Sequence, residues 1–266
     1  MSPLHAVILG IIQGVTEFLP VSSSAHLYVI PTLLGWRYEG VAFDVALHWG
    51  TLLALVLAYG RDWWKMFTAA FAGDRAAIGL LVRIAVATVP AAIAGVLLKD
   101  LAETMLRSLP LQAAMLFLFG FLLWAVDRFR PPGRDDDAPG WAACLAIGCA
   151  QVLALVPGVS RSGITITAGR GAGLSRVSAA RFSFLLAMPI TFGAGLLELR
   201  HLPHDVPMTS LALGVITAAV VGWLAIRGLI RWLSHAGLGI FFVYRAAFAA
   251  FILWRVLSAK GAAIAG

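Results

Sequence analysis

Two stretches of the sequence decide its fold: residues 13–27 read QGVTEFLPVSSSAHL, and residues 151–165 read QVLALVPGVSRSGIT. Each stretch places a proline and a group of hydroxyl side chains inside an otherwise apolar segment. Proline removes a backbone donor and interrupts a helix, so each segment predicts two short helices joined by a turn. Because the surrounding sequence is strongly apolar, we expect both turns to lie inside a membrane protein.

The composition of the chain agrees with this expectation. Of its 266 residues, 61% are hydrophobic and 12% are charged, whereas soluble domains carry about 25% charged residues. Uninterrupted apolar runs approach or reach the roughly 20 residues that cross a bilayer. They occupy residues 42–60, 77–98, 109–127, 179–199, 208–226 and 237–257. These runs do not alternate in polarity as barrel strands do, so the sequence predicts an all-α integral membrane protein.

The order of these segments predicts an internal repeat. A broken apolar unit, 3–34 or 141–170, precedes three uninterrupted runs in each half of the chain. We therefore divide a single membrane domain, 1–266, into repeat one at 1–127 and repeat two at 141–258, joined by the polar loop 128–140.

The arms of each broken unit are mostly short for a full crossing, which favours re-entrant helical hairpins over pairs of transmembrane helices. A hairpin returns to its own side, and three spans then carry the chain to the other side. The second half must therefore start from the opposite face, which gives an inverted-topology repeat with both hairpin tips near mid-membrane. Non-helical backbone is tolerated there only if it is buried in protein or lines a polar cavity.

Positive charges orient this arrangement. The formal net charge is +7, and Arg and Lys gather in short loops, which is typical of cytoplasmic loops and argues against nucleic-acid binding. The positive-inside bias places the loop 128–140 in the cytoplasm and both termini outside. The charges on the cytoplasmic side are Arg61, Lys65, Arg75, Arg128, Arg130, Arg134, Arg170, Arg176, Arg227 and Arg231.

The first broken segment carries acid–base and hydroxyl groups. Gln13 and Glu17 are four residues apart and share a helix face, so they are able to bind a metal, or to orient water or an imidazole. Ser22, Ser23 and Ser24 supply hydroxyls at the start of a second helix, whose free N–H groups favour an anion. In its first turn, His26 is able to shuttle a proton near neutral pH.

The second broken segment carries anion-binding groups. Gly158 allows close backbone approach, Ser160, Ser162 and Thr165 offer hydroxyls, and the Arg161 guanidinium matches a phosphate group. An arginine at mid-membrane needs an anion, which is either Glu17 or the substrate. The two segments together predict one buried site for a phosphate-bearing substrate. The alternatives are a structural Glu17–Arg161 ion pair and serines that only join helices.

Two further groups have open roles. Asp44 and His48 are four residues apart and are able to assist acid–base chemistry, although a buried Asp–His hydrogen bond is the favoured interpretation. Arg245 follows Tyr244 in the last apolar run and is either a second anion clamp or a counter-ion.

These motifs resemble the bacterial undecaprenyl-diphosphate phosphatase family of the bacitracin-resistance type. The resemblance covers nearly the whole chain in order, and it rests on the motifs QGVTEFLPVSSSAHL, FDVALHWGTLLAL, ATVPA, QVLALVPGVSRSGITI, RFSFLLAMP and FFVYR. It implies removal of the terminal phosphate from undecaprenyl diphosphate, which yields the monophosphate carrier recycled for peptidoglycan synthesis. It also implies a multi-pass protein of the bacterial inner membrane, a site facing the periplasm, a divalent-cation requirement, and bacitracin resistance on overproduction.

The family's functional residues fall on named positions of this chain. Its acidic motif falls on Gln13 and Glu17, its serine on Ser23 and its histidine on His26. Its second motif falls on Pro157, Gly158, Ser160, Arg161, Ser162 and Thr165. Gln13 stands where some members have Glu, which weakens the case for two carboxylates at the metal.

This resemblance leads to a mechanistic hypothesis. Arg161 with Ser160 and Ser162 clamps the diphosphate, and Mg²⁺ or Ca²⁺ binds near Glu17. His26 activates either Ser23 or a water molecule, a choice that the sequence leaves open. The phosphate-binding set as a whole is Gly158, Ser160, Arg161, Ser162, Thr165, Ser22 and Ser24.

A transporter or channel for an anionic or lipid-linked substrate is the alternative function, because inverted repeats with paired broken helices are common among transporters. We expect membrane lipid and undecaprenyl diphosphate as partners. A homodimer remains an open possibility.

Overall fold

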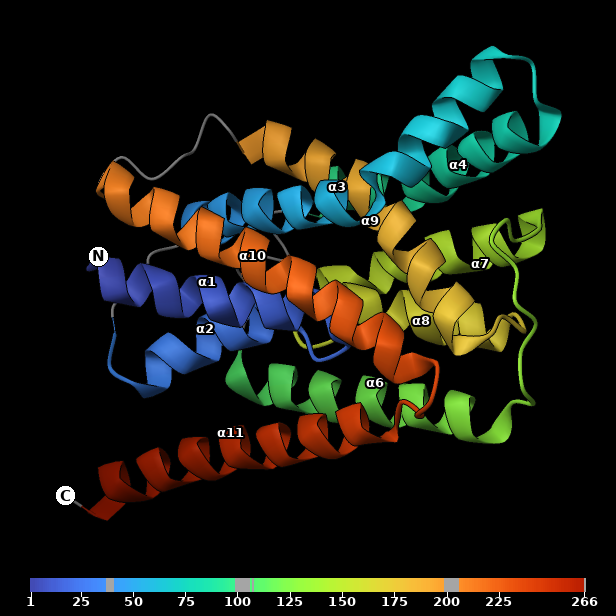
Figure 1. Ribbon diagram of the computed structural model, residues 1–266. Helices are drawn as coiled ribbons and strands as arrows, with labels where there is room; N and C mark the ends of the chain where they lie inside the picture. Colours follow the sequence, from blue (N-terminus) through green and yellow to red (C-terminus); the bar gives the residue numbers. More distant parts are fainter. Residues whose placement is uncertain (37–40, 99–105, 107, 199–205, 266) are drawn as a thin grey trace.

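The computed structural model describes residues 1–36, 41–98, 106, 108–198 and 206–265. These residues form helices and connecting turns, with one isolated β-bridge between Arg134 and Leu174 (Figure 1). The helices are α1 (Pro3–Phe18), α2 (Ser23–Leu33), α3 (Val41–Phe71), α4 (Arg75–Leu97), α6 (Leu109–Phe129), α7 (Trp141–Gln151), the 3₁₀ turn η1 (Val152–Leu155), α8 (Arg161–Gly171), α9 (Arg176–Glu198), α10 (Met208–Leu233) and α11 (Gly239–Ala265).

Six described helices, α3, α4, α6, α9, α10 and α11, are long and apolar enough to cross a membrane. They match the six predicted runs and confirm the all-α, multi-pass membrane class. The prediction for the first run was too short, because α3 continues from residue 60 to Phe71. Arg61 and Lys65 end an apolar span but are good helix formers. The turn comes only at Gly73, whose φ of +85° suits glycine.

Each broken unit consists, as predicted, of short helices joined by a turn. Residues 19–22 separate α1 from α2, and residues 156–160 separate η1 from α8. Figure 1 shows α1 and α7 approaching from opposite ends of the molecule, with the two turns meeting in its middle. Each turn ends in a serine with positive φ, Ser22 at 74° and Ser160 at 73°, directly before the second helix. Such a φ is uncommon outside glycine, and it occurs in both turns, each time directly before a helix.

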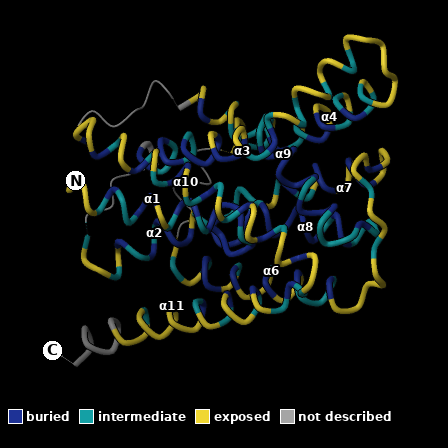
Figure 2. The backbone as a smooth tube through the Cα atoms, in the orientation of Figure 1, coloured by how far each residue is buried: buried dark blue, intermediate teal, exposed yellow. Residues whose placement is uncertain are grey.

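Close helix contacts hold the two halves together. In α1, Gly10 and Gly14 face α10, and Gly148 of α7 faces α4. Small residues at such positions let membrane helices approach closely. Figure 2 shows that burial is densest around the meeting turns, whereas the outer helices carry many exposed residues. The exposed side chains include Leu57 and Val96, which suits contact with lipid.

Replacing Gly148 by alanine is expected to destabilise the fold. The new Cβ would lie 2.3 Å from the carbonyl oxygen of Ala87, so α4 and α7 must move apart. Overpacking of this kind costs about 1–3 kcal/mol. The unfolding midpoint of the purified protein in detergent should therefore fall. Gly228→Ala is the matched control, since its Cβ meets nothing within 4 Å, and it should melt no lower than the wild type. Equal midpoints for the two variants would contradict this packing.

Candidate active site

The two turns are bound directly to each other. The Gly158 N–H donates to Ser22 Oγ at 3.2 Å, and Ser162 Oγ donates to the Leu19 carbonyl at 3.1 Å. Each bond joins a residue of the first half to one of the second. The predicted meeting of the two polar segments is thus present in the described structure.

Arg245 of α11 ties both turns to the core. Its side chain is fully buried, and its guanidinium donates to five backbone carbonyls. These carbonyls belong to Pro20, Met115, Leu116, Gly158 and Val159. Both sequence interpretations, anion clamp and counter-ion, are therefore wrong: the donors of Arg245 bind main-chain oxygens.

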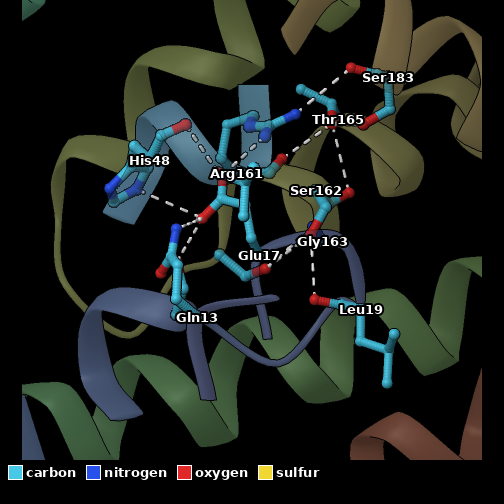
Figure 3. Close-up of polar contacts among 12 residues, drawn as sticks. Gln13, Glu17, Leu19, His48, Arg161, Ser162, Gly163, Thr165 and Ser183 are labelled. Carbon is cyan, nitrogen blue, oxygen red and sulfur yellow. Dashed lines mark hydrogen bonds and ion pairs between the residues drawn. The ribbon is translucent and has the colours of Figure 1, made fainter. Parts of the chain in front are cut away.

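The buried Glu17 carboxylate is the centre of the site (Figure 3). Its Oε1 accepts from Arg161 Nη2 at 2.7 Å, so an ion pair joins the two halves. Its Oε2 accepts from Ser23 Oγ at 2.6 Å and from Gln13 Nε2 at 3.3 Å. His48 Nε2 lies 3.4 Å from the same oxygen. Gln13 and Glu17 thus share a helix face, as their spacing predicts.

His48 belongs to this centre, although only a secondary role was predicted for it. The favoured interpretation joined it to the Asp44 side chain, but His48 Nδ1 lies 2.7 Å from the Asp44 backbone carbonyl. That contact directs Nε2 toward Glu17. The spacing within α3 was visible in the sequence, but the carboxylate that His48 faces is on α1, which periodicity within one helix does not reveal.

His26 lies away from this centre. Its Nδ1 is 2.7 Å from the Ser22 carbonyl, and its Nε2 is 2.6 Å from the Tyr244 hydroxyl. The ring also stacks on Phe248, with centroids 4.4 Å apart. The hypothesis required His26 to contact Ser23 or a water molecule beside it. The described contacts of His26 are with Ser22, Tyr244 and Phe248 instead. Two residues of α11, distant in sequence, thus contact the imidazole.

A cavity of about 250 Å³ lies beside Glu17. Residues of both halves line it. Its polar lining residues are Thr16, Glu17, Ser22, Ser23, Ser24, His48, Gln151, Ser160, Arg161 and Thr191. Of the predicted phosphate-binding residues, Ser22, Ser24, Ser160 and Arg161 thus face one space. Ser160 also caps α8, because its Oγ accepts from the Gly163 N–H at 3.1 Å.

The other predicted phosphate ligands face protein rather than the cavity. Thr165 donates to the Arg161 carbonyl and lies 2.6 Å from Ser183 Oγ. Ser162 binds the opposite turn, as described above. A Cβ on Gly158 would lie 2.6 Å from the Gln112 carbonyl oxygen, and its φ is +98°, so only glycine fits there. These three residues shape the second turn instead of lining the cavity.

The donor set near Glu17 bears on the expected divalent cation. No group of three or more His, Cys, Asp or Glu gathers around a possible metal position among the described residues. Both oxygens of Glu17 already accept hydrogen bonds, Oε2 from two donors and Oε1 from one, so Oε1 keeps a lone pair for a cation. Gln13 Oε1, in contrast, is buried without a described partner. Its chemistry suits a hard cation, which prefers oxygen ligands, but Gln13 is not among the residues that line the cavity.

Comparison with known proteins identifies the family. The family described as Bacitracin resistance protein BacA matches residues 6–251. A relative from Gemmatimonas aurantiaca named undecaprenyl-diphosphatase is 47% identical over 257 residues, covering 92% of this chain and 94% of the relative. Relatives of the same name from Desulforudis audaxviator and Moorella thermoacetica are 45% and 46% identical, covering 92% and 95% of this chain. These matches confirm the resemblance drawn from the motifs: the chain belongs to the bacitracin resistance protein BacA family.

Proposed function

We propose that this protein hydrolyses undecaprenyl diphosphate to undecaprenyl phosphate and inorganic phosphate, and so recycles the lipid carrier for cell-wall synthesis. The names of its relatives support this reaction. The observation that carries it is the Glu17–Arg161 pair, which joins the two halves beside Ser23 in a membrane-embedded cavity. An anion clamp, a hydroxyl and a carboxylate able to take its proton are the groups that phosphoryl transfer requires.

Arg161 binds the substrate in this proposal. A diphosphate entering the cavity competes with Glu17 for the guanidinium, which forms paired hydrogen bonds with phosphate oxygens. Ser160 and the backbone at the start of α8 add donors to the same group. Loss of the Arg161 contact leaves Glu17 free to act as a base.

Glu17 then acts on the nucleophile. Ser23 Oγ already donates to Glu17 Oε2 at 2.6 Å, so the carboxylate is placed to accept the hydroxyl proton or that of a water in its position. The nucleophile attacks the terminal phosphorus, and the bond to the bridging oxygen breaks. That oxygen leaves with undecaprenyl phosphate. If Ser23 attacks, water then hydrolyses the phosphoserine; if water attacks, inorganic phosphate forms directly.

The two histidines have supporting roles. His48 fixes the orientation of the Glu17 carboxylate from α3. His26 acts as a positioning residue, because its contact with the Ser22 carbonyl holds the turn that presents Ser23. This assignment replaces the direct proton relay through His26, since no hydrogen bond between His26 and either Ser23 or Glu17 is present among the described contacts.

A divalent cation, Mg²⁺ or Ca²⁺, completes the proposed site. When bound, it would neutralise charge on the diphosphate oxygens. Gln13 Oε1 would hold it, with the substrate and water supplying most other ligands.

Removal of the cation with EDTA is expected to stop phosphate release, and added Mg²⁺ or Ca²⁺ should restore it. Gln13→Glu adds a carboxylate, so the cation concentration that gives half-maximal activity should fall by about tenfold, the size of one charged contact. Cation binding to the variant, measured by calorimetry without substrate, should tighten equally. Unchanged cation affinity would remove Gln13 from the site.

The inverted-topology repeat is also part of the proposal. The equivalent serine turns support it, as does the matching of the α1–α10 and α7–α4 contacts. In this arrangement each half contributes one re-entrant hairpin and three transmembrane helices to a protein of the bacterial inner membrane. The loop 128–140 lies in the cytoplasm and the cavity opens to the periplasm.

Transport is the alternative that the paired broken helices favour. Purified protein in liposomes separates the two functions. Hydrolysis requires inorganic phosphate to be released from undecaprenyl diphosphate, with Glu17→Gln losing the activity; loss of activity in Ser23→Ala as well would assign the attack to Ser23. Flux of a labelled anion or lipid-linked substrate without phosphate release would overturn the proposal in favour of transport.

A further inference from the structure

Gln151 is the polar residue of the cavity that the reaction scheme leaves without a role. It ends α7, is only 2% exposed, and is one of the residues that line the cavity shared with Glu17 and Arg161. Neither its Nε2 nor its Oε1 has a hydrogen-bond partner among the described residues. A buried amide without hydrogen bonds lowers the stability of the folded state, and most buried polar groups in proteins are hydrogen-bonded. A ligand that pairs it on binding would explain its presence.

The repeat gives a second observation that points the same way. Gln13 and Gln151 each lie nine residues before the positive-φ serine of their own half. In the first half, Gln13 Nε2 is held by Glu17. Glu17 lies four residues after Gln13. Four residues after Gln151 the second half has Leu155, which lines the cavity and offers no hydrogen-bond acceptor in its side chain. The amide of Gln151 thus lacks the partner that Gln13 has, in a residue that lines the cavity.

The chemistry of the surroundings identifies the ligand. On the second half of the site, Arg161 is cationic and Ser160 offers a hydroxyl. A diphosphate group presents many acceptor oxygens and has more of them than one guanidinium can bind. An amide N–H₂ adds two neutral donors and suits such oxygens.

We propose that Gln151 binds the diphosphate group of the substrate, with Nε2 donating to a phosphate oxygen beside Arg161. This inference rests on the proposed function for the identity of the substrate. It assigns Gln151 to ground-state binding of the diphosphate, whereas Ser23 and Glu17 carry out the chemistry. Its loss therefore raises KM more than it lowers kcat.

Gln151→Leu tests the proposal, because it keeps the approximate volume and removes both polar atoms. The Kd for a polyprenyl methylenediphosphonate, a non-hydrolysable analogue, should rise by about tenfold or more, as expected for a hydrogen bond to a charged group. KM for undecaprenyl diphosphate should rise equally. The unfolding midpoint without ligand should stay the same or increase, since an unpaired buried amide has been removed. A glutamine that served only the fold would give the opposite pattern, with lower stability and unchanged Kd.

Two further variants make the outcome decisive. Gln151→Glu places a carboxylate against the phosphates and should weaken analogue binding beyond the leucine variant. Cys149→Ala, at an exposed position of the same helix, is the matched control and should bind as the wild type does. Equal Kd values for all four proteins would overturn the role of Gln151. A wild-type protein that binds the analogue through Gln151 but releases no phosphate would instead overturn the proposed hydrolysis and support the binding inference.

Discussion

Replacing Arg161 by alanine is expected to lower kcat/KM for phosphate release by about a thousandfold, the upper range for removing one preorganised charge-stabilising donor. Arg161 lines the cavity, and its Nη2 lies 2.7 Å from Glu17 Oε1. Its loss removes the proposed phosphate clamp and leaves Glu17 without its ion-pair partner. Arg161→Lys keeps the charge but not the planar pair of donors, so a loss of about a hundredfold is expected. Initial rates of phosphate release from undecaprenyl diphosphate measure both effects.

Arg181→Ala is the control for the Arg161 series. Arg181 lies on α9 and pairs at 3.0 Å with the exposed Asp137, outside the cavity. Its replacement should leave the rate within a factor of about two, as exposed ion pairs contribute little. Breaking a buried pair also destabilises, so unfolding midpoints must accompany the rates. An Arg161→Ala protein that folds and turns over at the wild-type rate would exclude Arg161 from the mechanism.

Replacing Arg245 by methionine is expected to have the largest effect on stability. Methionine fills a similar space but leaves the carbonyls of both turns without this donor. A buried acceptor that loses its partner costs about 1–3 kcal/mol, and Arg245 serves five carbonyls. The total approaches or exceeds the whole stability of many domains, about 5–15 kcal/mol. We therefore expect little folded protein after extraction, measured by size-exclusion chromatography and by the unfolding midpoint.

The matched control is Arg255→Met on the same helix. Arg255 is exposed, so its replacement should leave both the yield and the midpoint close to those of the wild type. If Arg245→Met folds normally but loses activity, the residue belongs to the chemistry of the site. That result would contradict its role as the tie between the turns.

Much of the fold could be predicted because its signals are local. Six apolar runs predicted six long helices, and Pro20 and Pro157 predicted the two interruptions. The end of α3 could not be found in this way, since charged residues stop a membrane span without stopping a helix. Helix α3 therefore continues to Phe71.

The site was predictable where one segment supplies both partners and less so where three helices meet. The Gln13–Glu17 pair followed from the spacing within the first motif. Glu17 was one of two anions expected for Arg161, and the Ser23–Glu17 hydrogen bond was not predicted. The position of His26 depends on Tyr244 of α11, and the role of His48 depends on α1. Such contacts between distant helices have no periodic signature in one sequence.

Arg245 is a second example of contacts that could not be predicted from the sequence. The sequence reveals a buried arginine but not its partners, because the residue pattern does not show which backbone carbonyls are free to accept hydrogen bonds. Anions were therefore the natural partners to expect. The structure satisfies the guanidinium with main-chain oxygens from both turns and α6.

The central claim is that one residue from each half of the chain forms a single hydrolytic site, and a double-mutant cycle on Glu17 and Arg161 tests it most directly. The measurement is kcat/KM for phosphate release from undecaprenyl diphosphate by the wild type, Glu17→Gln, Arg161→Ala and the double variant. Residues that act as a unit are strongly non-additive, so each single change should remove nearly all activity and the double variant should be hardly worse. Activity losses that simply multiply, or near-normal turnover in either single variant, would contradict a shared site.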